Sequence, residues 1–228
     1  KTTVVVGESG SSKSETLKDI ILEFLSNHEN GIVRVIDDNT SQKNLVKKLK
    51  GELFRLDESD VKDDGFSPFD IENCSEMDVE GLTSLIINAL KTANKDFSAE
   101  SVHYEIIRDA IKRTYNAYNA FRSEVESHRH PVWSDILEQF PNVKEGFKSK
   151  GISETYVTRA MTDIRTYSLS LGEGGAYGMI FSKRQSRSDQ SVERYKVFDL
   201  AGIENPELKK ILYMTAFLKI SRDLTSLG

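Results

Sequence analysis

The amino-acid sequence predicts an α/β fold with a mainly parallel sheet, interrupted by an all-α insertion. Three observations predict it. A glycine-containing turn at 7–14 stands between an apolar strand pattern and an amphipathic helix pattern. A second apolar strand pattern follows that helix, and the resulting βαβ unit is typical of parallel sheets. Glycine is then absent between Gly81 and Gly146, where the apolar spacing is helical.

The composition is that of a globular protein with an ample core. Of the 228 residues, 38% are hydrophobic and 29% are charged. The net charge of −5 argues against a surface that coats nucleic acid, although it allows a local basic patch. The single cysteine, Cys74, excludes an intramolecular disulfide framework and fits a reducing cytosol. No apolar stretch reaches 18 residues, so we expect neither a membrane span nor a signal peptide, and the chain reads as a piece of something longer.

The first turn has the spacing of a phosphate-binding P-loop. The consensus is G-x-x-x-x-G-K-[ST], and the chain matches it except that Ser12 replaces the second glycine. Backbone N–H groups of such a turn, and of the helix that follows, converge on an anion. Lys13 would place its charge at the β/γ-phosphates of ATP, and the Ser14 hydroxyl would ligate Mg²⁺. The expected nucleotide-binding residues are Gly7, Ser9, Gly10, Ser11, Ser12, Lys13, Ser14 and Glu15. Lys13 and Glu8 are the expected catalytic residues, with Glu8 positioning water or metal.

Ser12 bears directly on whether this turn binds nucleotide. A Cβ at this position takes up room where the backbone must approach a phosphate, and it restricts φ. The serine is compatible with a natural tolerance, an inactivating drift or an engineered change.

The remaining core elements follow from short apolar runs and helical spacing. Strands are expected at 2–6, 32–36, 52–56 and 194–199, and helices at 16–25, 44–49 and 206–224. We expect an acidic loop at 57–64, a turn with two aromatic anchors at 66–70, a glycine-rich segment at 171–181 and a polar loop at 182–193.

The insertion shows four apolar faces, separated by breaks at 94–98, 128–131 and 141–146. They consist of Leu82, Leu85, Ile86 and Leu90; of Tyr104, Ile107, Ile111, Tyr115 and Tyr118; of Val132, Ile136, Leu137 and Phe140; and of Tyr156, Ala160 and Ile164. The predicted domain organisation is a first part of the α/β core at 1–76, the insertion at 77–166 and the continued core at 167–228.

Two strands end in a carboxylate that is suited to hold Mg²⁺ beside a P-loop. These are Asp37, at the end of Val33-Arg34-Val35-Ile36, and Asp199, at the end of Tyr195-Lys196-Val197-Phe198. The structural alternative is an aspartate that caps the next element.

Three further groups have ordinary structural explanations. His128 and His130 stand in what reads as a solvated turn, with no metal-ligand spacing. The aromatic stripe Tyr104, Tyr115, Tyr118 and Phe121 is expected in the core rather than as a base-stacking platform. The basic loop 183–187 is expected to be solvated, or to contact nucleic acid or a neighbouring subunit.

The order of motifs resembles the ATPase domain of the TraC-like conjugal-transfer ATPases of type IV secretion systems. It is carried by Val4–Ser14, Arg34–Asp38, Gly51–Leu56, Phe66–Ile71, Gly175–Phe181 and Val197–Ile203. In that family an N-P-F-(D/N) turn follows the third strand, and here Ser67 replaces the Asn.

The resemblance implies a RecA-like P-loop core with an all-α insertion, ATP and Mg²⁺ as cofactors, and assembly into a homo-hexamer. It implies a bacterial cytoplasmic ATPase, peripherally associated with the inner membrane and with other secretion components. That ATPase would energise pilus assembly or the transfer of DNA or protein. It further implies that the Walker-B acids, the γ-phosphate sensor and the arginine finger follow the last helix, so that this segment alone would hydrolyse ATP poorly. Direct contact with nucleic acid stays open.

Two alternatives accompany this interpretation. One is a related hexameric DNA translocase, whose ATPase activity DNA would stimulate in a salt-dependent way. The other is a catalytically silent assembly domain in which the phosphate cradle has decayed at Ser12.

Overall fold

The structure is a computed structural model that describes residues 13–121, 130–184 and 193–226. The chain divides into two compact units. The first is drawn from residues 1–58, 188–204 and 219–228, and the second from residues 59–187 and 205–218. The predicted strand at 2–6 and the P-loop up to Ser12 lie outside the described residues.

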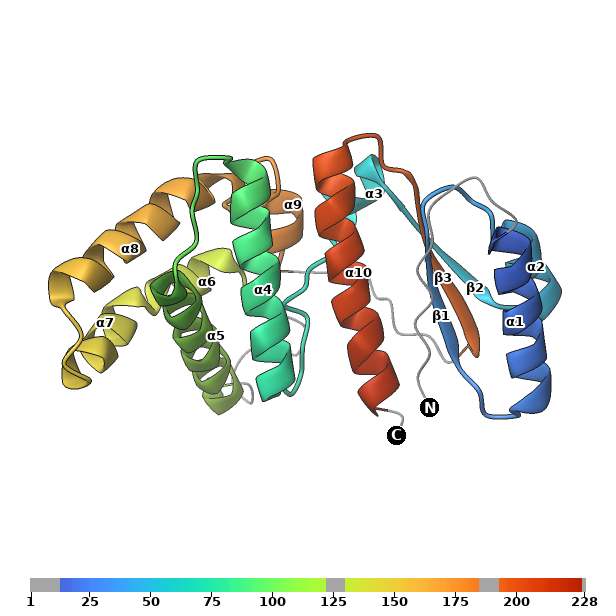
Figure 1. Cartoon of the computed structure of the whole chain (residues 1–228), viewed down its shortest axis with the longest axis horizontal. Coiled ribbons are helices and arrows are strands. Elements are labelled where there is room, and N and C mark those ends of the chain that lie inside the picture. Colours follow the sequence, from blue (N-terminus) through green and yellow to red (C-terminus); the bar gives the residue numbers. More distant parts are fainter. Residues whose placement is uncertain (1–12, 122–129, 185–192, 227–228) are drawn as a thin grey trace. The chain divides into compact units, whose positions relative to one another are not determined.

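The first unit contains a parallel sheet. Its described strands are β1 (Val33–Asp37), β2 (Glu52–Asp57) and β3 (Tyr195–Gly202), and their order is β1-β3-β2 (Figure 1). Both pairs are parallel, so the predicted strands at 32–36, 52–56 and 194–199 are confirmed. The central strand β3 is buried over its first six residues, as expected of a strand covered on both faces.

Two helices cover one face of this sheet. They are α1 (Lys13–Asn27) and α2 (Lys43–Leu49). The residues that pack there are apolar and come from both helices and all three strands: Leu17, Ile21, Leu22, Leu25, Leu45, Val46, Leu49, Val33, Val35, Leu53, Tyr195 and Val197. The alternation of the strands places the neighbouring residues, such as Phe54 and Phe198, on the opposite face.

The end of α1 is tied to the residue that precedes β3. The guanidinium of Arg194 donates to the carbonyl oxygens of Leu25 at 2.9 Å, of His28 at 2.5 Å and of Gly31 at 3.1 Å. These carbonyls belong to the last turn of the helix and to the loop after it, where no intrahelical donor reaches them. A cation at this end also opposes the negative pole of the helix dipole.

The second unit consists of helices. Its elements are α3 (Glu58–Asp64, from Ser59 on), α4 (Glu76–Ala93), α5 (Ser101–Phe121), α6 (Trp133–Glu138), α7 (Phe140–Ser149), α8 (Glu154–Tyr167), the 3₁₀ turn η1 (Ser168–Leu171), α9 (Gly178–Phe181) and the first part of α10 (Pro206–Ser226). A capping box starts α4, since Ser75 Oγ accepts from Asp78 N and the Asp78 carboxylate accepts from Ser75 N. Leu82, Ile86 and Leu90 of this helix are fully buried.

Three details of the second unit differ from the sequence predictions. The acidic segment 57–64 was expected as a loop but forms α3, because Val61 is fully buried and anchors a helical turn. The expected break at 141–146 lies inside α7, where Pro141 occupies the first helical turn and costs no hydrogen bond. Tyr156 is 43% exposed, and Val157 takes its place in the core of α8.

The predicted insertion at 77–166 lies wholly within the second unit, whose own limits are wider. The division at 76 and 166 remains a prediction. No helix in the described part of the chain is long and apolar enough to cross a membrane.

Candidate nucleotide site at the carboxyl edge of the sheet

The start of α1 and the ends of the strands lie at one edge of the first unit. Only a short turn, closed by the bond from Gly31 N to His28 O, connects α1 to β1, so the two elements run in opposite directions (Figure 1). The beginning of α1 therefore lies at the edge where β1 ends. Because the sheet is parallel, β2 and β3 end at the same edge. Ligands of open parallel sheets bind at this edge.

The helix begins at Lys13, the second to last residue of the P-loop sequence. Its first backbone N–H groups, which include those of Lys13, Ser14 and Glu15, have no partner within the helix. They are the groups that would hold a phosphate. Glu15 is exposed and pairs with Lys18, its carboxylate lying 2.7 Å from the Lys18 ammonium. Residues 7–12, which hold the other predicted nucleotide ligands and Glu8, lie outside the described residues.

The two predicted metal-binding carboxylates are neighbours at this edge. Asp37 on β1 pairs in register with Asp199 on β3, and Arg55 on β2 pairs in register with Asp199 from the other side. Residues in register on parallel strands project to the same face. Asp37, Asp199 and Arg55 therefore form one polar row on the face that carries α1 and α2.

Asp37 acts as a local cap. Its Oδ1 accepts from Asn39 N at 3.3 Å, its Oδ2 accepts from Gln42 N at 2.9 Å, and the Ser41 hydroxyl lies 3.2 Å from both oxygens. Such bonds fix the turn that leads into α2. Both oxygens are thus occupied by donors from the chain, as in the capping alternative.

Asp199 is in a different environment. Its side chain is 1% exposed, and its Oδ1 accepts from Ala201 N at 3.1 Å. Its Oδ2 is buried and has no hydrogen-bond partner among the described residues. Arg55 Nε lies 3.7 Å from Oδ2, on a side chain that is half exposed. A buried carboxylate oxygen without a donor is uncommon and indicates a site for a further partner.

The residues at this edge fit a bound magnesium ion through one carboxylate, that of Asp199. Asp199 offers an oxygen that a hydrated cation could satisfy, whereas Asp37 offers none. The described residues hold no group of three or more acidic, histidine or cysteine side chains that is placed to bind a metal ion. Mg²⁺ is ordinarily held by one or two protein oxygens together with phosphates and water, so such a cluster is not required.

Arg55 and Tyr195 are site residues that the sequence analysis did not single out. Tyr195 lies on the same face as Asp199 and donates its hydroxyl to Gln42 Oε1 at 3.0 Å. Burial, and then the negative charge of Asp37, raise the pKa of the Tyr195 phenol. The tyrosine thus stays neutral and holds the turn that Asp37 caps. For both Arg55 and Tyr195, the sequence signal that could have indicated a site role is a polar side chain within an apolar strand pattern.

The other sequence candidates have structural roles. His130 was expected in a solvated turn, but it is buried, and its Nε2 lies 2.8 Å from the Lys183 carbonyl oxygen. Arg184 of the basic loop makes a bidentate ion pair with Asp135, at 2.7 and 2.8 Å. Tyr115 is buried in the core, as predicted, and donates to Phe69 O. Tyr104 of the same stripe is 38% exposed.

The chain is similar to a solved structure, although not to a known protein at the level of sequence. No family model matches the chain, and no curated protein matches it at the level of sequence. Among solved structures, VirB4 of Thermoanaerobacter pseudethanolicus is similar to it, with a TM-score of 0.57 and 15% sequence identity. The match covers 94% of this chain and 76% of that one. The chain therefore has a VirB4-like fold, of mixed helix and strand with a small parallel sheet.

Proposed function

We propose that the chain is part of the ATPase domain of a conjugative type IV secretion ATPase, which binds and hydrolyses ATP to energise pilus assembly or substrate transfer. One observation carries the proposal. The P-loop sequence runs directly into α1 at the carboxyl edge of a parallel sheet, where Asp199 keeps a buried oxygen that no described residue donates to. The RecA-like character of the core, the hexamer and the association with the inner membrane belong to this proposal.

The comparison and the order of motifs point in the same direction. VirB4 is a type IV secretion ATPase, and the resemblance in motifs is to the TraC-like ATPases of the same kind of machine. The similarity in fold to VirB4 supports a role in type IV secretion. The assignment to the TraC-like ATPases is the more specific proposal.

ATP–Mg²⁺ would be held from two sides. Lys13 and the first backbone N–H groups of α1 would bind the phosphates, and the Ser14 hydroxyl would ligate the metal. Asp199 would accept hydrogen bonds from water on the metal, and the Arg55 guanidinium lies 3.7 Å from the same carboxylate. Mg²⁺ supplies charge neutralisation at the phosphates.

The proposal is tested by titrating the protein with a fluorescent ATP analogue in the presence and absence of Mg²⁺. We expect saturable, Mg²⁺-dependent binding that the Lys13→Ala variant loses. Lys18→Ala is a matched control, because Lys18 lies one turn further along α1 and pairs with Glu15. No saturable signal, or an equal loss with both variants, would show that Lys13 is not a phosphate ligand.

Ser12 favours one alternative strongly enough to be tested beside it, namely a silent assembly domain. If the loop has decayed, neither the original protein nor its Lys13→Ala variant binds ATP, and Ser12→Gly restores binding. For the DNA translocase alternative, the test is stimulation of the ATPase rate by DNA, with a rate that falls as salt rises.

A further inference from the structure

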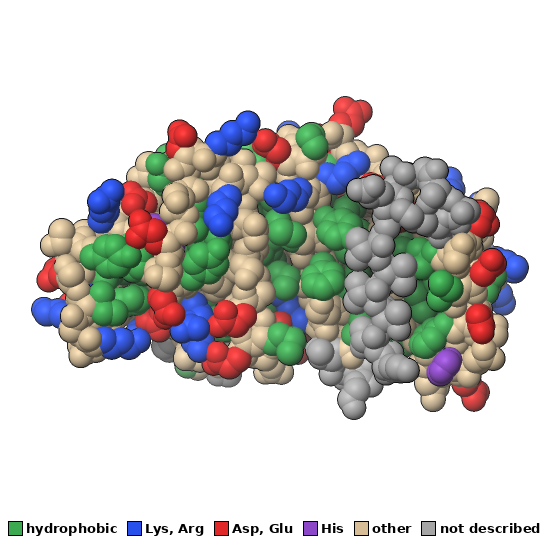
Figure 2. All heavy atoms as spheres, viewed as in Figure 1, with side chains coloured by type: hydrophobic (Ala, Val, Ile, Leu, Met, Phe, Trp, Pro, Cys, Tyr) green, Lys and Arg blue, Asp and Glu red, His purple; other side chains and the backbone are tan. Residues whose placement is uncertain are grey.

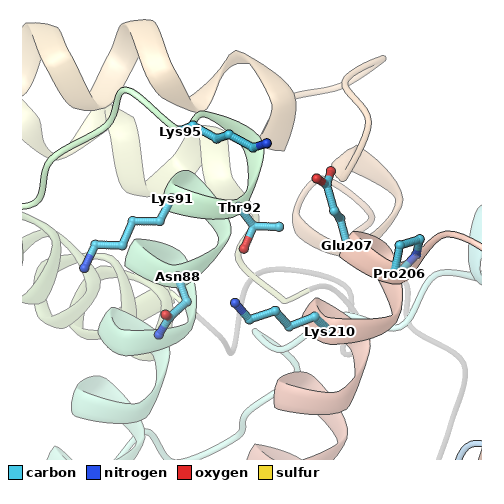
Figure 3. A pocket seen from close by; sticks show the side chains of 7 residues that line it. All are labelled: Asn88, Lys91, Thr92, Lys95, Pro206, Glu207 and Lys210. Carbon is cyan, nitrogen blue, oxygen red and sulfur yellow. The ribbon is translucent and has the colours of Figure 1, made fainter.

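A cationic hollow lies in the second unit. It has a volume of about 350 Å³ and opens between the end of α4 and the first turns of α10 (Figure 3). Its lining residues are Asn88, Lys91, Thr92, Lys95, Pro206, Glu207 and Lys210. Figure 3 shows Lys95 and Lys210 reaching over the gap from opposite helices, while Lys91 extends along the outer side of α4.

The hollow has an excess of positive charge. Lys91, Lys95 and Lys210 are exposed, and none has a carboxylate within 4.0 Å in the described part of the chain. Lys112 and Lys144 of the same unit are paired, with Glu76 at 2.6 Å and with Glu154 at 2.9 Å. The one acid of the lining, Glu207, accepts a hydrogen bond from the Tyr177 hydroxyl at 3.2 Å.

The lysine side chains, rather than the helix terminus, would attract an anion here. The first N–H groups of α10 are already satisfied, since Asn205 Oδ1 accepts from Glu207 N at 2.9 Å and from Leu208 N at 3.1 Å. The charge of the three ammonium groups is what remains available to a ligand.

Exposed aromatic residues continue this surface along α10. Lys210, Tyr213 and Phe217 follow at i, i+3 and i+7, which places them on one helix face over a rise of about 10 Å. Tyr213 is 42% exposed and Phe217 is 46% exposed. Figure 2 shows Lys and Arg side chains near the start of α10 and hydrophobic side chains further along it.

We infer that this surface, the lysine hollow with the Tyr213–Phe217 face, binds single-stranded nucleic acid. Lysine ammonium groups would contact the phosphates, and the exposed rings would stack with unpaired bases. The two kinds of side chain match the two parts of a single strand, its charged backbone and its flat bases. The inference does not depend on nucleotide binding at the P-loop.

Other polyanions use only part of this surface. A duplex or an acidic peptide would engage the lysines but give the aromatic rings nothing to stack on, because duplex bases are already stacked. An anionic membrane needs a broad apolar helix face, whereas this strip carries two aromatic residues. These ligands therefore serve as the contrasts in the experiment.

The first experiment measures the salt dependence of binding. The full chain is titrated against a fluorescein-labelled oligothymidylate by fluorescence anisotropy, at salt concentrations between about 50 and about 200 mM. We compare it with the triple variant Lys91→Gln, Lys95→Gln, Lys210→Gln. Three lost phosphate contacts reduce the slope of log K against log[salt] by about 2, because each contributes about 0.7. The loss of affinity over that salt range then shrinks by about 20-fold.

Matched controls separate the surface from net charge. The triple variant Lys62→Gln, Lys148→Gln, Lys150→Gln removes the same charge from exposed lysines of the same unit and is expected to keep the slope. Replacing Lys91, Lys95 and Lys210 by arginine is expected to retain binding. An equal change in slope with both glutamine variants would overturn the proposal.

The second experiment tests stacking. Tyr213→Ala and Phe217→Ala are each expected to weaken oligothymidylate binding by about 5-fold or more without changing the salt slope. Tyr104→Ala, an exposed aromatic on α5, is the control and is expected to have no effect. Equal affinity for a duplex of the same length, tighter binding of polyglutamate or of anionic vesicles, or no binding at the lowest salt would each overturn the assignment. Circular dichroism of every variant checks that the fold is kept.

Discussion

Asp37 and Asp199 pair in register on the adjacent parallel strands β1 and β3, yet their carboxylates have different partners. Both oxygens of Asp37 accept hydrogen bonds from the turn before α2, whereas Asp199 Oδ2 is buried and no residue in the described ranges donates to it. The sequence presents the two aspartates as equivalent, but their hydrogen-bond partners distinguish them. Asp37 caps the turn before α2, and Asp199 is the carboxylate that we propose lies beside the metal. The first two predictions follow from this difference.

Asp199→Asn is expected to weaken Mg²⁺ binding to the ATP complex by about 10- to 100-fold, as for other outer-shell partners of a metal. The reason is the loss of the buried negative charge next to the phosphate end of α1. The measurement is a Mg²⁺ titration of the fluorescent ATP signal. Asp38→Asn is the matched control, since Asp38 is exposed and adjacent to Asp37. If both variants bind Mg²⁺ normally, Asp199 has no role at the metal.

Asp37→Ala is expected to lower the free energy of unfolding by about 1–3 kcal/mol, because it leaves the buried Gln42 N–H without an acceptor. Urea denaturation followed by circular dichroism measures the loss. Asp38→Ala should change stability by less than about 0.5 kcal/mol, as for most surface substitutions. A larger effect of Asp38→Ala would contradict the capping role assigned to Asp37.

Ser12→Gly is expected to raise the affinity for ATP by about 5-fold or more, because it removes the Cβ at a position of close backbone approach to phosphate. The measurement is the same fluorescent titration. Ser11→Gly changes the neighbouring residue in the same chemical way and serves as the control. Unchanged affinity with Ser12→Gly, while the original protein binds well, would show that the loop tolerates serine.

Lys196 contributes to stability through two aromatic rings and one carboxylate. It is fully buried, its ammonium lies 4.9 Å from the Phe54 ring centroid and 5.1 Å from that of Phe198, and it is 3.5 Å from Glu52 Oε2. We expect Lys196→Ala to cost about 2–5 kcal/mol, since it leaves a cavity in the sheet face. Lys196→Met keeps most of the volume and is expected to cost less. Thermal unfolding of both variants tests this order, and the reverse order would show that the charge matters more than the packing.

Tyr177 makes stability depend on pH in the alkaline range. Burial, together with the charge of Glu207, raises the pKa of its phenol to about 12 from an ordinary value of 10.0. The unfolded chain loses this proton first, so stability is fully present below about pH 10 and falls as the pH rises toward 12. Tyr177→Phe is expected to remove this part of the pH dependence. The measurement is the free energy of unfolding from urea denaturation, taken between these pH values for the original protein and the Tyr177→Phe variant. The same dependence of that free energy on pH in both proteins would contradict the prediction.

The sequence predicts the parallel sheet well, because short apolar runs between turn signals have few alternatives to a strand. The strands predicted at 32–36, 52–56 and 194–199 correspond to β1, β2 and β3. The predicted and observed first residues agree within two positions. It predicts the helical unit less well. A single apolar residue, Val61, is too weak a pattern to indicate α3, and a proline at the start of α7 reads as a break when its position in the turn is unknown.

The candidate site depends on features that a strand pattern does not contain. The bonds from Ser41 and Gln42 to Asp37 require the fold of the turn, and the approach of Arg55 to Asp199 requires the register between β2 and β3. Sequence spacing alone therefore leaves Asp37 and Asp199 equivalent. The phase of α8 shows the same limit, since a shift of one residue exchanges Tyr156 for Val157 in the core.

The three bonds from Arg194 to the end of α1 have a consequence for the phosphate end of that helix. The helix of 15 residues is about 22 Å long, and its first turn is the part that would hold phosphate. A helix that is held at its C-terminal end can change its orientation less at its N-terminal end. Arg194 thus restricts the direction in which the first N–H groups of α1 point, although it binds the opposite end of the helix.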